Sequence, residues 1–212
     1  GLRVIAPDLI GFGKSDKPVS KSDYSYAAHV DWMREFIETL DLGNITVFCQ
    51  DWGSLIGLRV AAENEHRFAR IALGNGGLPT GDHPMPYIWW MMRRAMETAP
   101  TLDIGRAVAA GCVRGLADEH RAAYDAPFPS REYMAGPRVF PSLVNEVPGT
   151  TAEAWAGLTA FEKPFLTLWA SNDPGNLGSC AAQQRFIDNV PGAAGQPHDR
   201  LPEASHFLQD DQ

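Results

Sequence analysis

The sequence has 212 residues, of which 44% are apolar, and it carries a formal net charge of −8 at pH 7. This size and composition are typical of one domain, or of one domain with an insertion, that buries a sizeable core. The acidic balance argues against a nucleic-acid-binding surface, and the lack of an apolar run of about 18 residues argues against a membrane span.

The first forty residues predict a strand, a loop and a helix. Residues 2–6 predict a buried strand, which leads into a loop at 7–18. The Gly-Lys-Ser at 13–15 lacks the glycine that a phosphate loop has five positions earlier, where Asp8 stands, so the glycines indicate a tight surface loop instead. Ser25 predicts the N-cap of an amphipathic helix. The apolar positions of that helix are Val30, Met33, Ile37 and Leu40.

The segment 45–62 predicts a strand, a sharp turn and a helix. β-Branched and aromatic residues fill most of 45–49, and apolar residues resume at Leu55. Cys49 and Gly53 flank Asp51 at the two positions where a nucleophile elbow has small residues, and such an elbow exposes its apex residue at the top of a parallel sheet. In the simpler interpretation, Asp51 only caps the helix that follows.

A carboxylate at the apex of an elbow predicts a particular chemistry. An ionised carboxylate can displace a leaving group from saturated carbon and form an alkyl ester without help from a base. Hydrolysis of that ester then requires a histidine as general base, an acid that orients the histidine, and N–H donors for the developing oxyanion.

The rest of the chain predicts a parallel α/β sheet interrupted by an all-helical insertion. A short strand at 71–75 continues the alternation of strands and helices. Residues 77–157 then predict short helices at 87–96, 104–113, 118–123 and 132–139. The α/β pattern resumes with a capping box from Thr150 to Glu153, a strand at 164–170, a helix at 180–189 and the start of a helix at 207–212. We therefore expect a partial core from 1–76 and 158–212, with a cap or lid from 77–157 over the carboxyl ends of the strands.

Asp51, Asp173 and His206 occur in the chain order that α/β-hydrolases use for nucleophile, acid and base. Asp173 lies in the loop after the strand at 164–170. Of its rivals, Asp188 lies within a predicted helix, and Asp199 is too close to His206 in sequence. His198 is the main rival of His206. The other histidines, which are less favourably placed, are His29, His66, His83 and His120.

Four motifs together resemble the haloalkane dehalogenases, and the resemblance extends over essentially the whole chain. The motifs lie at 7–18, at 50–57 (Gln-Asp-Trp-Gly-Ser-Leu-Ile-Gly), at 126–129 (Ala-Pro-Phe-Pro) and at 204–207 (Ala-Ser-His-Phe). The resemblance implies an α/β-hydrolase fold and hydrolytic dehalogenation of haloalkanes to a primary alcohol and halide. It is closest to the branch whose catalytic acid follows the later strand, which here gives a catalytic triad of Asp51, Asp173 and His206.

The resemblance further implies that two tryptophan indole N–H groups bind the departing halide. Trp52 matches the tryptophan after the nucleophile, and the lid offers Trp89 and Trp90, of which Trp90 is the better match. An indole N–H donates without accepting, which suits it to hold an anion on an apolar wall. The alternative is that the lid tryptophans serve packing alone. The family also implies earlier strands and a His-Gly loop that this sequence lacks, so we interpret the chain as an internal fragment whose remaining oxyanion donor is the Trp52 N–H.

Two other classes of function are considered. An epoxide hydrolase shares the aspartate nucleophile but requires a pair of lid tyrosines, and Tyr87, Tyr124 and Tyr133 show no obvious pairing in the sequence. A binding protein of the same fold that has lost its chemistry is disfavoured by the presence of all three triad residues.

The expected ligands are small. We expect a halogenated aliphatic substrate, water and a halide ion, with no metal or organic cofactor, no nucleic acid and no membrane. Cys49, Cys112 and Cys180 are odd in number and lack CxxC spacing, so they predict neither a zinc site nor a disulfide framework. Reduced thiols in a cytoplasmic protein are the simplest interpretation.

Overall fold

The computed structural model of the chain describes residues 1–82, 84–174 and 176–212. Its strands are β1 (Ile45–Asp51), β2 (Phe68–Gly76), β3 (Phe165–Ala170) and β4 (Asp199–Leu201). Its α-helices are α1 (Tyr26–Thr39), α2 (Trp52–Glu63), α3 (Tyr87–Thr98), α4 (Ile104–Ala110), α5 (Asp118–Asp125), α6 (Ala135–Leu143), α7 (Thr151–Thr159), α8 (Cys180–Asn189) and α9 (Leu208–Asp211). Short 3₁₀ helices span Lys21–Asp23, Glu65–Arg67, Arg131–Met134, Val144–Glu146, Pro148–Thr150 and Pro191–Ala193. Among the described residues, no helix has the length and apolar character that crossing a bilayer requires.

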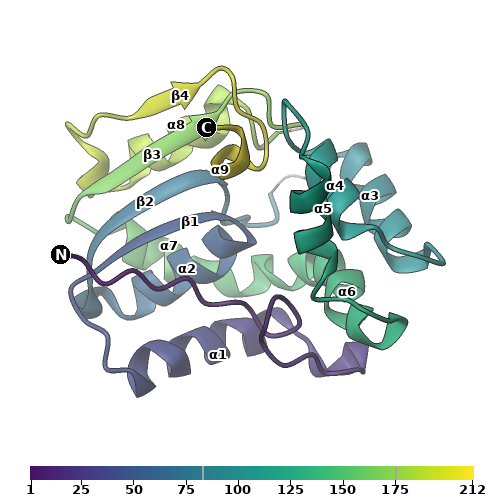
Figure 1. Cartoon of the computed structure of the whole chain (residues 1–212). Coiled ribbons are helices and arrows are strands. Elements are labelled where there is room, and N and C mark those ends of the chain that lie inside the picture. Colours follow the sequence, from purple (N-terminus) through teal and green to yellow (C-terminus); the bar gives the residue numbers. More distant parts are fainter. Residues whose placement is uncertain (83, 175) are drawn as a thin grey trace.

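The four strands form one parallel sheet in the order β1-β2-β3-β4. Cys49 pairs with Leu73, and Leu73 with Thr167, so the register is continuous across the first three strands. Because all strands run in the same direction, their carboxyl ends meet at one edge of the sheet, which in Figure 1 faces α3, α4 and α5. The α/β class expected from the sequence is confirmed, and the structure adds β4, which the sequence did not suggest.

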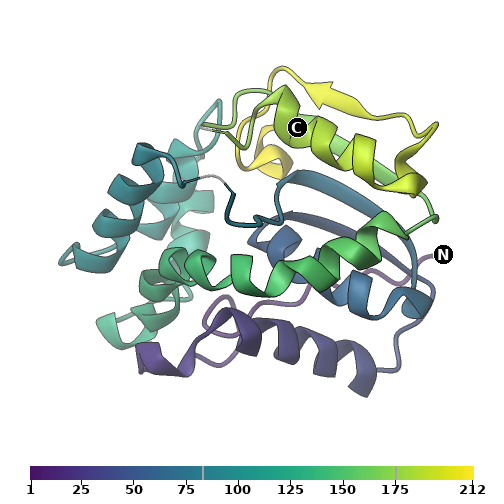
Figure 2. The ribbon, with the colours of Figure 1, turned by 180° about the vertical axis from the view of Figure 1, so that it is seen from behind.

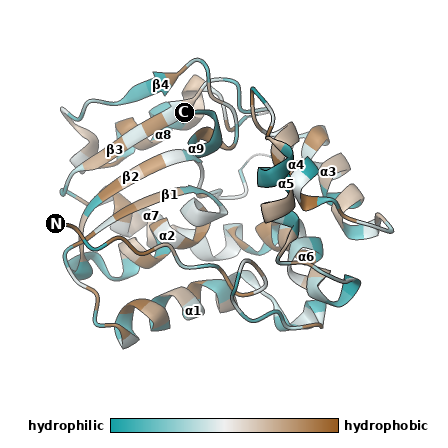
Figure 3. Ribbon diagram, in the orientation of Figure 1, coloured by the Kyte–Doolittle hydropathy of each residue, from teal (hydrophilic) through white to brown (hydrophobic). Residues whose placement is uncertain are grey.

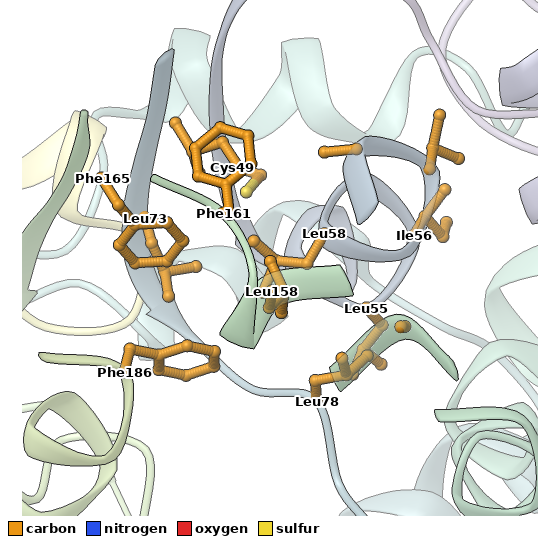
Figure 4. Close-up of a cluster of buried hydrophobic side chains, with 14 of the residues drawn as sticks. Cys49, Leu55, Ile56, Leu58, Leu73, Leu78, Leu158, Phe161, Phe165 and Phe186 are labelled. Carbon is orange, nitrogen blue, oxygen red and sulfur yellow. The ribbon is translucent and has the colours of Figure 1, made fainter. Parts of the chain in front are cut away.

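The core forms where α2 packs between the sheet and the helices α1 and α7. Figure 2 shows α1, α2, α7 and α8 on one side of the sheet, and Figure 3 shows that the central strands are largely apolar. Leu58 of α2, Leu158 of α7, and Phe161 and Phe165 are all fully buried in this layer. Figure 4 shows these side chains gathered in one cluster. Burial of each such side chain contributes on the order of 2 kcal/mol, so this layer holds the elbow of α2 in place.

Most of the expected elements of the core are present. Ser25 caps α1 as predicted, since its side chain accepts the Ala28 N–H. The capping box expected at α7 is wrong, because Thr150 donates its hydroxyl to the Val147 carbonyl and does not cap the helix.

The predicted strand at 2–6 is also wrong. These residues are extended but join no strand, and Leu2 and Val4 are 96% and 87% exposed. A strand requires a neighbour that pairs with its backbone N–H and C=O groups, and the sheet ends at β1 without recruiting this segment. Phe48, on the outermost strand, is half exposed as a consequence.

The glycine-rich loop at 7–18 is a braced turn, as expected. The Asp8 carboxylate accepts the Lys14 N–H at 2.8 Å, and the Ser15 hydroxyl donates to the Asp8 carbonyl. Gly11 and Gly13 have φ angles of 95° and 48°, and a Cβ on Gly13 would overlap the Asp8 carboxylate. Both glycines are therefore required by the turn itself.

Helices α3 to α6 form a group beyond the strand ends, in the region expected to be a cap (Figure 1). The pairs α4 with α5 and α3 with α6 pack against each other. The helix expected at 104–113 ends earlier, at Ala110, and that at 132–139 is a 3₁₀ turn followed by α6. The boundaries of the cap at 77 and 157 stay a prediction.

His29 is a buried histidine whose ring is surrounded by aromatic side chains. It is 1% exposed, neither ring nitrogen has a hydrogen-bond partner among the described residues, and the rings of Tyr24, Trp32 and Phe140 lie within 6.1 Å of it. Burial lowers the pKa of His29 to about 4, from its usual 6.5. The folded state therefore holds this imidazole neutral at pH values where the unfolded chain protonates it.

We expect the substitution His29→Phe to remove an acid-dependent loss of stability. Because the pKa is lower in the folded state, protonation favours the unfolded chain, and stability falls as the pH drops from 6.5 towards 4. The full shift corresponds to about 3 kcal/mol. Urea unfolding between pH 4.5 and 7.5 should show this loss in the wild type and in the exposed-site control His120→Phe. If His29→Phe keeps the same pH dependence, the assignment is wrong.

Candidate active site

Asp51 stands at a sharp turn between β1 and α2. Its backbone has φ 46° and ψ −120°, a conformation that residues other than glycine rarely adopt and that is stored at a cost of about 1–3 kcal/mol. Its side chain makes no capping hydrogen bond to α2. The interpretation of Asp51 as a simple helix cap is therefore not supported by the geometry, whereas the turn has the strained shape of a nucleophile elbow.

Small residues allow strand and helix to approach closely at this turn. A Cβ placed on Gly57 would lie 3.4 Å from the Cβ of Cys49, and one placed on Gly53 would lie 3.8 Å from it. Cys49 is itself buried, and burial raises the pKa of its thiol to about 12. Cys49 thus acts as a small apolar residue here, not as a second nucleophile.

Ser54 braces the turn from within the first turn of α2. Its hydroxyl lies 2.5 Å from the Asp51 carbonyl oxygen, to which it donates, and it accepts the Gly77 N–H at 2.9 Å. A Cβ on Gly76 would overlap the Ser54 side chain, so a glycine is needed beside it. Sequence reasoning did not identify this role of Ser54, because it depends on β2 reaching the elbow.

Three of the predicted residues come together at the carboxyl edge of the sheet. The Asp173 carboxylate, in the loop after β3, lies 3.0 Å from Nδ1 of His206, in the loop after β4. On the other side of the ring, Nε2 of His206 lies 3.7 Å from the Asp51 carboxylate. Asp173 is 5% exposed, whereas the side chain of Asp51 is 34% exposed. The imidazole thus lies between a buried acid and a solvent-accessible carboxylate, with one ring nitrogen near each.

The loop of Asp173 and the loop of His206 are joined by backbone and side-chain hydrogen bonds. Ser171 N–H donates to the Leu201 carbonyl at 3.0 Å, and Asn172 N–H donates to the Ala204 carbonyl at 3.1 Å. The Ser205 hydroxyl donates to the Asn172 carbonyl at 3.1 Å. These bonds fix the backbone on both sides of the contact between acid and base, so the 3.0 Å distance does not depend on side-chain rotamers alone.

Asn75 positions the end of β3 from inside the sheet. It is fully buried, its Nδ2 donates to the Ala170 carbonyl at 2.8 Å, and its Oδ1 accepts the Ala170 N–H at 2.6 Å. The structure shows that this amide holds the last residue of β3, three positions before Asp173.

Burial and neighbouring charges alter the pKa of both residues that face each other. Burial raises the pKa of Asp51, although the charge of His206 and the Trp52 N–H act in the opposite sense. Burial lowers the pKa of His206, but the hydrogen bond to Asp173 and the charges of Asp51 and Asp173 outweigh it, so the pKa is raised overall. The imidazole therefore binds a proton more readily while Asp51 is ionised.

His198, the main rival of His206, has a structural position. Its Nδ1 accepts the Thr167 N–H at 3.1 Å, and its Nε2 lies 2.8 Å from the Ala193 carbonyl. Both ring nitrogens are thus used to join β3 to the loop before β4. His66 and His120 are exposed, and His83 lies outside the described residues.

The rival carboxylates have local partners. Asp188 accepts a hydrogen bond from Gln184 on the same helix, and Asp199 accepts the N–H of its neighbour Arg200. Neither interaction involves His206.

The tryptophans expected at a halide site lie in different surroundings. The Trp52 ring stacks on Phe140 of α6 with centroids 4.0 Å apart. Trp89 and Trp90 of α3 meet edge to face at 4.8 Å, and the Arg93 guanidinium lies over both rings. Trp90 is 48% exposed. The structure thus joins Trp52 to the helical region through Phe140, and it gives Trp90 an exposed position on α3.

The lid tyrosines are not paired as an epoxide hydrolase requires. Tyr124 donates its hydroxyl to the Asp210 carboxylate at 2.9 Å, and burial together with Asp210 raises its pKa to about 12. Tyr87 and Tyr133 are 78% and 42% exposed. Because the Tyr124 hydroxyl already donates to Asp210, a role as proton donor to an alkoxide is disfavoured.

Sequence reasoning also missed Gln50, the residue before the apex. Its Nε2 donates to the backbone carbonyl of His206 at 2.9 Å, which connects β1 directly to the loop of the base. Nothing in the sequence indicated that contact, because the two residues are 156 positions apart.

The chain is similar in sequence and in fold to known proteins. A family model described as alpha/beta hydrolase fold matches residues 1–186. The haloalkane dehalogenase of Mycolicibacterium paratuberculosis is 49% identical over 216 residues, covering 100% of this chain and 70% of the relative. That of Psychrobacter cryohalolentis is 46% identical and covers 100% of this chain and 71% of the relative. Among solved structures, the tetrameric haloalkane dehalogenase DpaA of Paraglaciecola agarilytica has a TM-score of 0.88 at 28% identity, covering 96% of this chain and 69% of that one.

We expect the pKa of His206 to lie above the usual 6.5 in the free protein and to fall in the variant Asp51→Asn. The substitution removes the negative charge 3.7 Å from Nε2 while keeping the size of the side chain. Titration of the His206 ring by NMR measures both values. An unchanged pKa in Asp51→Asn would mean that the two side chains are not coupled, and Asp188→Asn serves as the control at a site without contact to the ring.

Proposed function

The chain belongs to the haloalkane dehalogenases of the α/β-hydrolase superfamily, hydrolases that act on carbon–halide bonds, and we propose that Asp51, His206 and Asp173 carry out this reaction through an ester intermediate. The observation that supports the assignment is the line of contacts from Asp173 through His206 to Asp51, at 3.0 and 3.7 Å. Asp51 is the last residue of β1, and Asp173 and His206 lie in the loops after β3 and β4, which are the positions that an α/β-hydrolase uses for its triad.

In the first step, a carboxylate oxygen of Asp51 attacks the halogen-bearing carbon. A C–O bond forms as the C–X bond breaks, and the halide leaves with the bonding electron pair. The strained backbone of Asp51 supports this role, because it projects the side chain away from the strand and leaves it 34% exposed. A carboxylate needs no base to act as a nucleophile, so this step does not involve proton transfer by His206.

In the second step, His206 removes a proton from water, and the resulting hydroxide attacks the carbonyl carbon of the Asp51 ester. Collapse of the tetrahedral intermediate breaks the acyl C–O bond, and the departing alkoxide takes the proton from His206 to leave as the alcohol. Asp51, left as a carboxylic acid, releases its proton to water and returns to the carboxylate. Asp173 accepts a hydrogen bond from Nδ1 and stabilises the imidazolium that forms. The backbone N–H of Trp52, at the first position of α2 directly after Asp51, is suited to stabilise the oxyanion.

The halide contacts follow from the same arrangement. We propose that the indole N–H of Trp52 binds the leaving halide, with Trp90 of α3 as the second donor. Trp52 adjoins the nucleophile in sequence and is held by the Phe140 ring of α6. The assignment of Trp90 over Trp89 depends on motif position; Trp90 is 48% exposed and meets Trp89 edge to face.

Residues 77–157 are proposed to act as a cap over the site. Helices α3 to α6 of this segment lie beyond the carboxyl edge of the sheet, where substrates bind in open α/β folds (Figure 1). Phe140 links this region to Trp52, and a closed cap would exclude water from the halide while the first step occurs.

We expect His206→Phe to trap the ester. The variant retains the nucleophile but lacks the base, so 1,2-dibromoethane or a 1-chloroalkane should release about one halide per enzyme and leave Asp51 alkylated. Turnover should fall by a factor of about 10²–10⁴. Intact-mass spectrometry measures the adduct, with His66→Phe as an exposed control and Asp51→Asn as the variant that forms none. Diol formation from styrene oxide without halide release would favour an epoxide hydrolase instead.

We expect Trp52→Phe and Trp90→Phe to weaken halide binding, and Trp89→Phe to leave it near the wild-type value. Each of the first two substitutions removes one N–H donor to a charged ligand, worth about 1.5–3 kcal/mol, so the halide dissociation constant should rise more than tenfold. Halide titration monitored by tryptophan fluorescence measures it. The neighbouring pair Trp89 and Trp90 forms a matched comparison, and the reverse order of effects would transfer the role to Trp89.

A further inference from the structure

Asp211 is a buried carboxylate to which the proposed mechanism assigns no function. It lies at the end of α9, five residues after His206, and is 6% exposed. Its Oδ2 accepts the Ser205 N–H at 2.8 Å, and its Oδ1 accepts the Val113 N–H at 2.8 Å. The two oxygens of one side chain therefore bind the residue immediately before the base and a residue from the helical region.

A second contact joins the same two segments. The N–H of Phe207 donates to the Gly111 carbonyl at 3.3 Å, and a Cβ on Gly111 would overlap the Phe207 ring. Gly111 follows the last residue of α4. Phe207, on one side of His206, therefore contacts the segment 111–113 directly, and Ser205, on the other side, is connected to it through Asp211. On its other side, the loop is held to the sheet by Gln50, which donates to the His206 carbonyl.

We propose that Asp211 is a positioning residue for ester hydrolysis, and that it couples the cap to the general base. A carboxylate that accepts N–H bonds from two segments fixes their separation, and charge-assisted bonds of this kind are about twice as strong as neutral ones. The inference depends on the proposed function, because it assumes that His206 activates water. The new element is that the orientation of the His206 ring depends on the segment after α4, to which Asp211 is bound.

The inference predicts that the two chemical steps respond differently to the loss of Asp211. Attack by Asp51 on the substrate requires no base, so its rate depends little on the orientation of the imidazole. Hydrolysis requires Nε2 to direct a water at the ester carbonyl, and small displacements of a catalytic group reduce rates strongly. A general loss of folding would slow both steps together.

The test compares Asp211→Asn with Asp210→Asn in the full-length protein. Asn at 211 is nearly isosteric, but its NH₂ group faces one of the two N–H donors, so one of the bonds to Ser205 or Val113 is lost. The matched control changes the neighbouring residue, whose carboxylate binds the Tyr124 hydroxyl on α5. Rapid-quench experiments with 1,2-dibromoethane measure the halide burst, and intact-mass spectrometry follows decay of the alkyl-enzyme.

We expect Asp211→Asn to slow ester decay at least about tenfold while the halide burst changes less than about threefold, and Asp210→Asn to leave both rates near the wild-type values. Equal slowing of both steps, or no slowing of decay in a variant with an unchanged circular dichroism spectrum, overturns the inference. His206→Phe separates this from failure of the proposed function. If His206→Phe traps the ester but Asp211→Asn does not slow its decay, only the inference fails, whereas absence of the ester in both defeats the proposed function.

Discussion

The left-handed turn at Asp51 is the constraint on which the rest of the site depends. A φ of 46° on a residue with a side chain is unfavourable, and the turn persists because its surroundings determine it more strongly than local preference does. Ser54 binds the Asp51 carbonyl and the backbone of the loop after β2, and α2 is buried between the sheet and two helices. Core packing thus offsets the backbone strain at Asp51. As a result, the Asp51 carboxylate projects from the edge of the sheet.

The proposed acid–base pair depends on a second constraint, the hydrogen bonding between two loops. Parallel strands place the loops after β3 and β4 side by side, but strand order alone does not set a 3.0 Å contact between side chains. Hydrogen bonds between residues 171–172 and 201–205 hold the two loops together. The Asn75 side chain binds the backbone of Ala170, and the Gln50 side chain binds the His206 carbonyl, so both loops are also fixed to the sheet. Asp211 extends the same network to the segment after α4.

The sequence predicts the parts of this structure that local patterns encode. The alternation of strands and helices, the cap of α1 by Ser25 and the small residues around Asp51 are readable because each depends on neighbours within a few positions. The contacts of Ser54 with Gly77, of Gln50 with His206, of Asn75 with Ala170 and of Asp211 with Val113 were missed because they join residues 23 to 156 positions apart, where no periodicity gives a signal.

The failed strand at 2–6 has the same origin. Its composition suits a strand, but a strand forms only against a partner, and composition does not reveal whether a partner is present. A local pattern therefore predicts the capacity of a segment to pair, and the tertiary arrangement decides the outcome.

The charges of the proposed site change during the reaction in a way that favours the second step. In the resting protein, ionised Asp51 raises the pKa of His206, which favours an imidazolium that cannot accept a proton. Esterification removes the charge of Asp51, so this contribution to the pKa is lost and the ring returns toward the neutral form that a general base requires. Asp173 continues to hold Nδ1 throughout, which fixes the tautomer that leaves Nε2 free to accept a proton. In the proposed mechanism, the same carboxylate serves as nucleophile and, by losing its charge, returns the base to its neutral form.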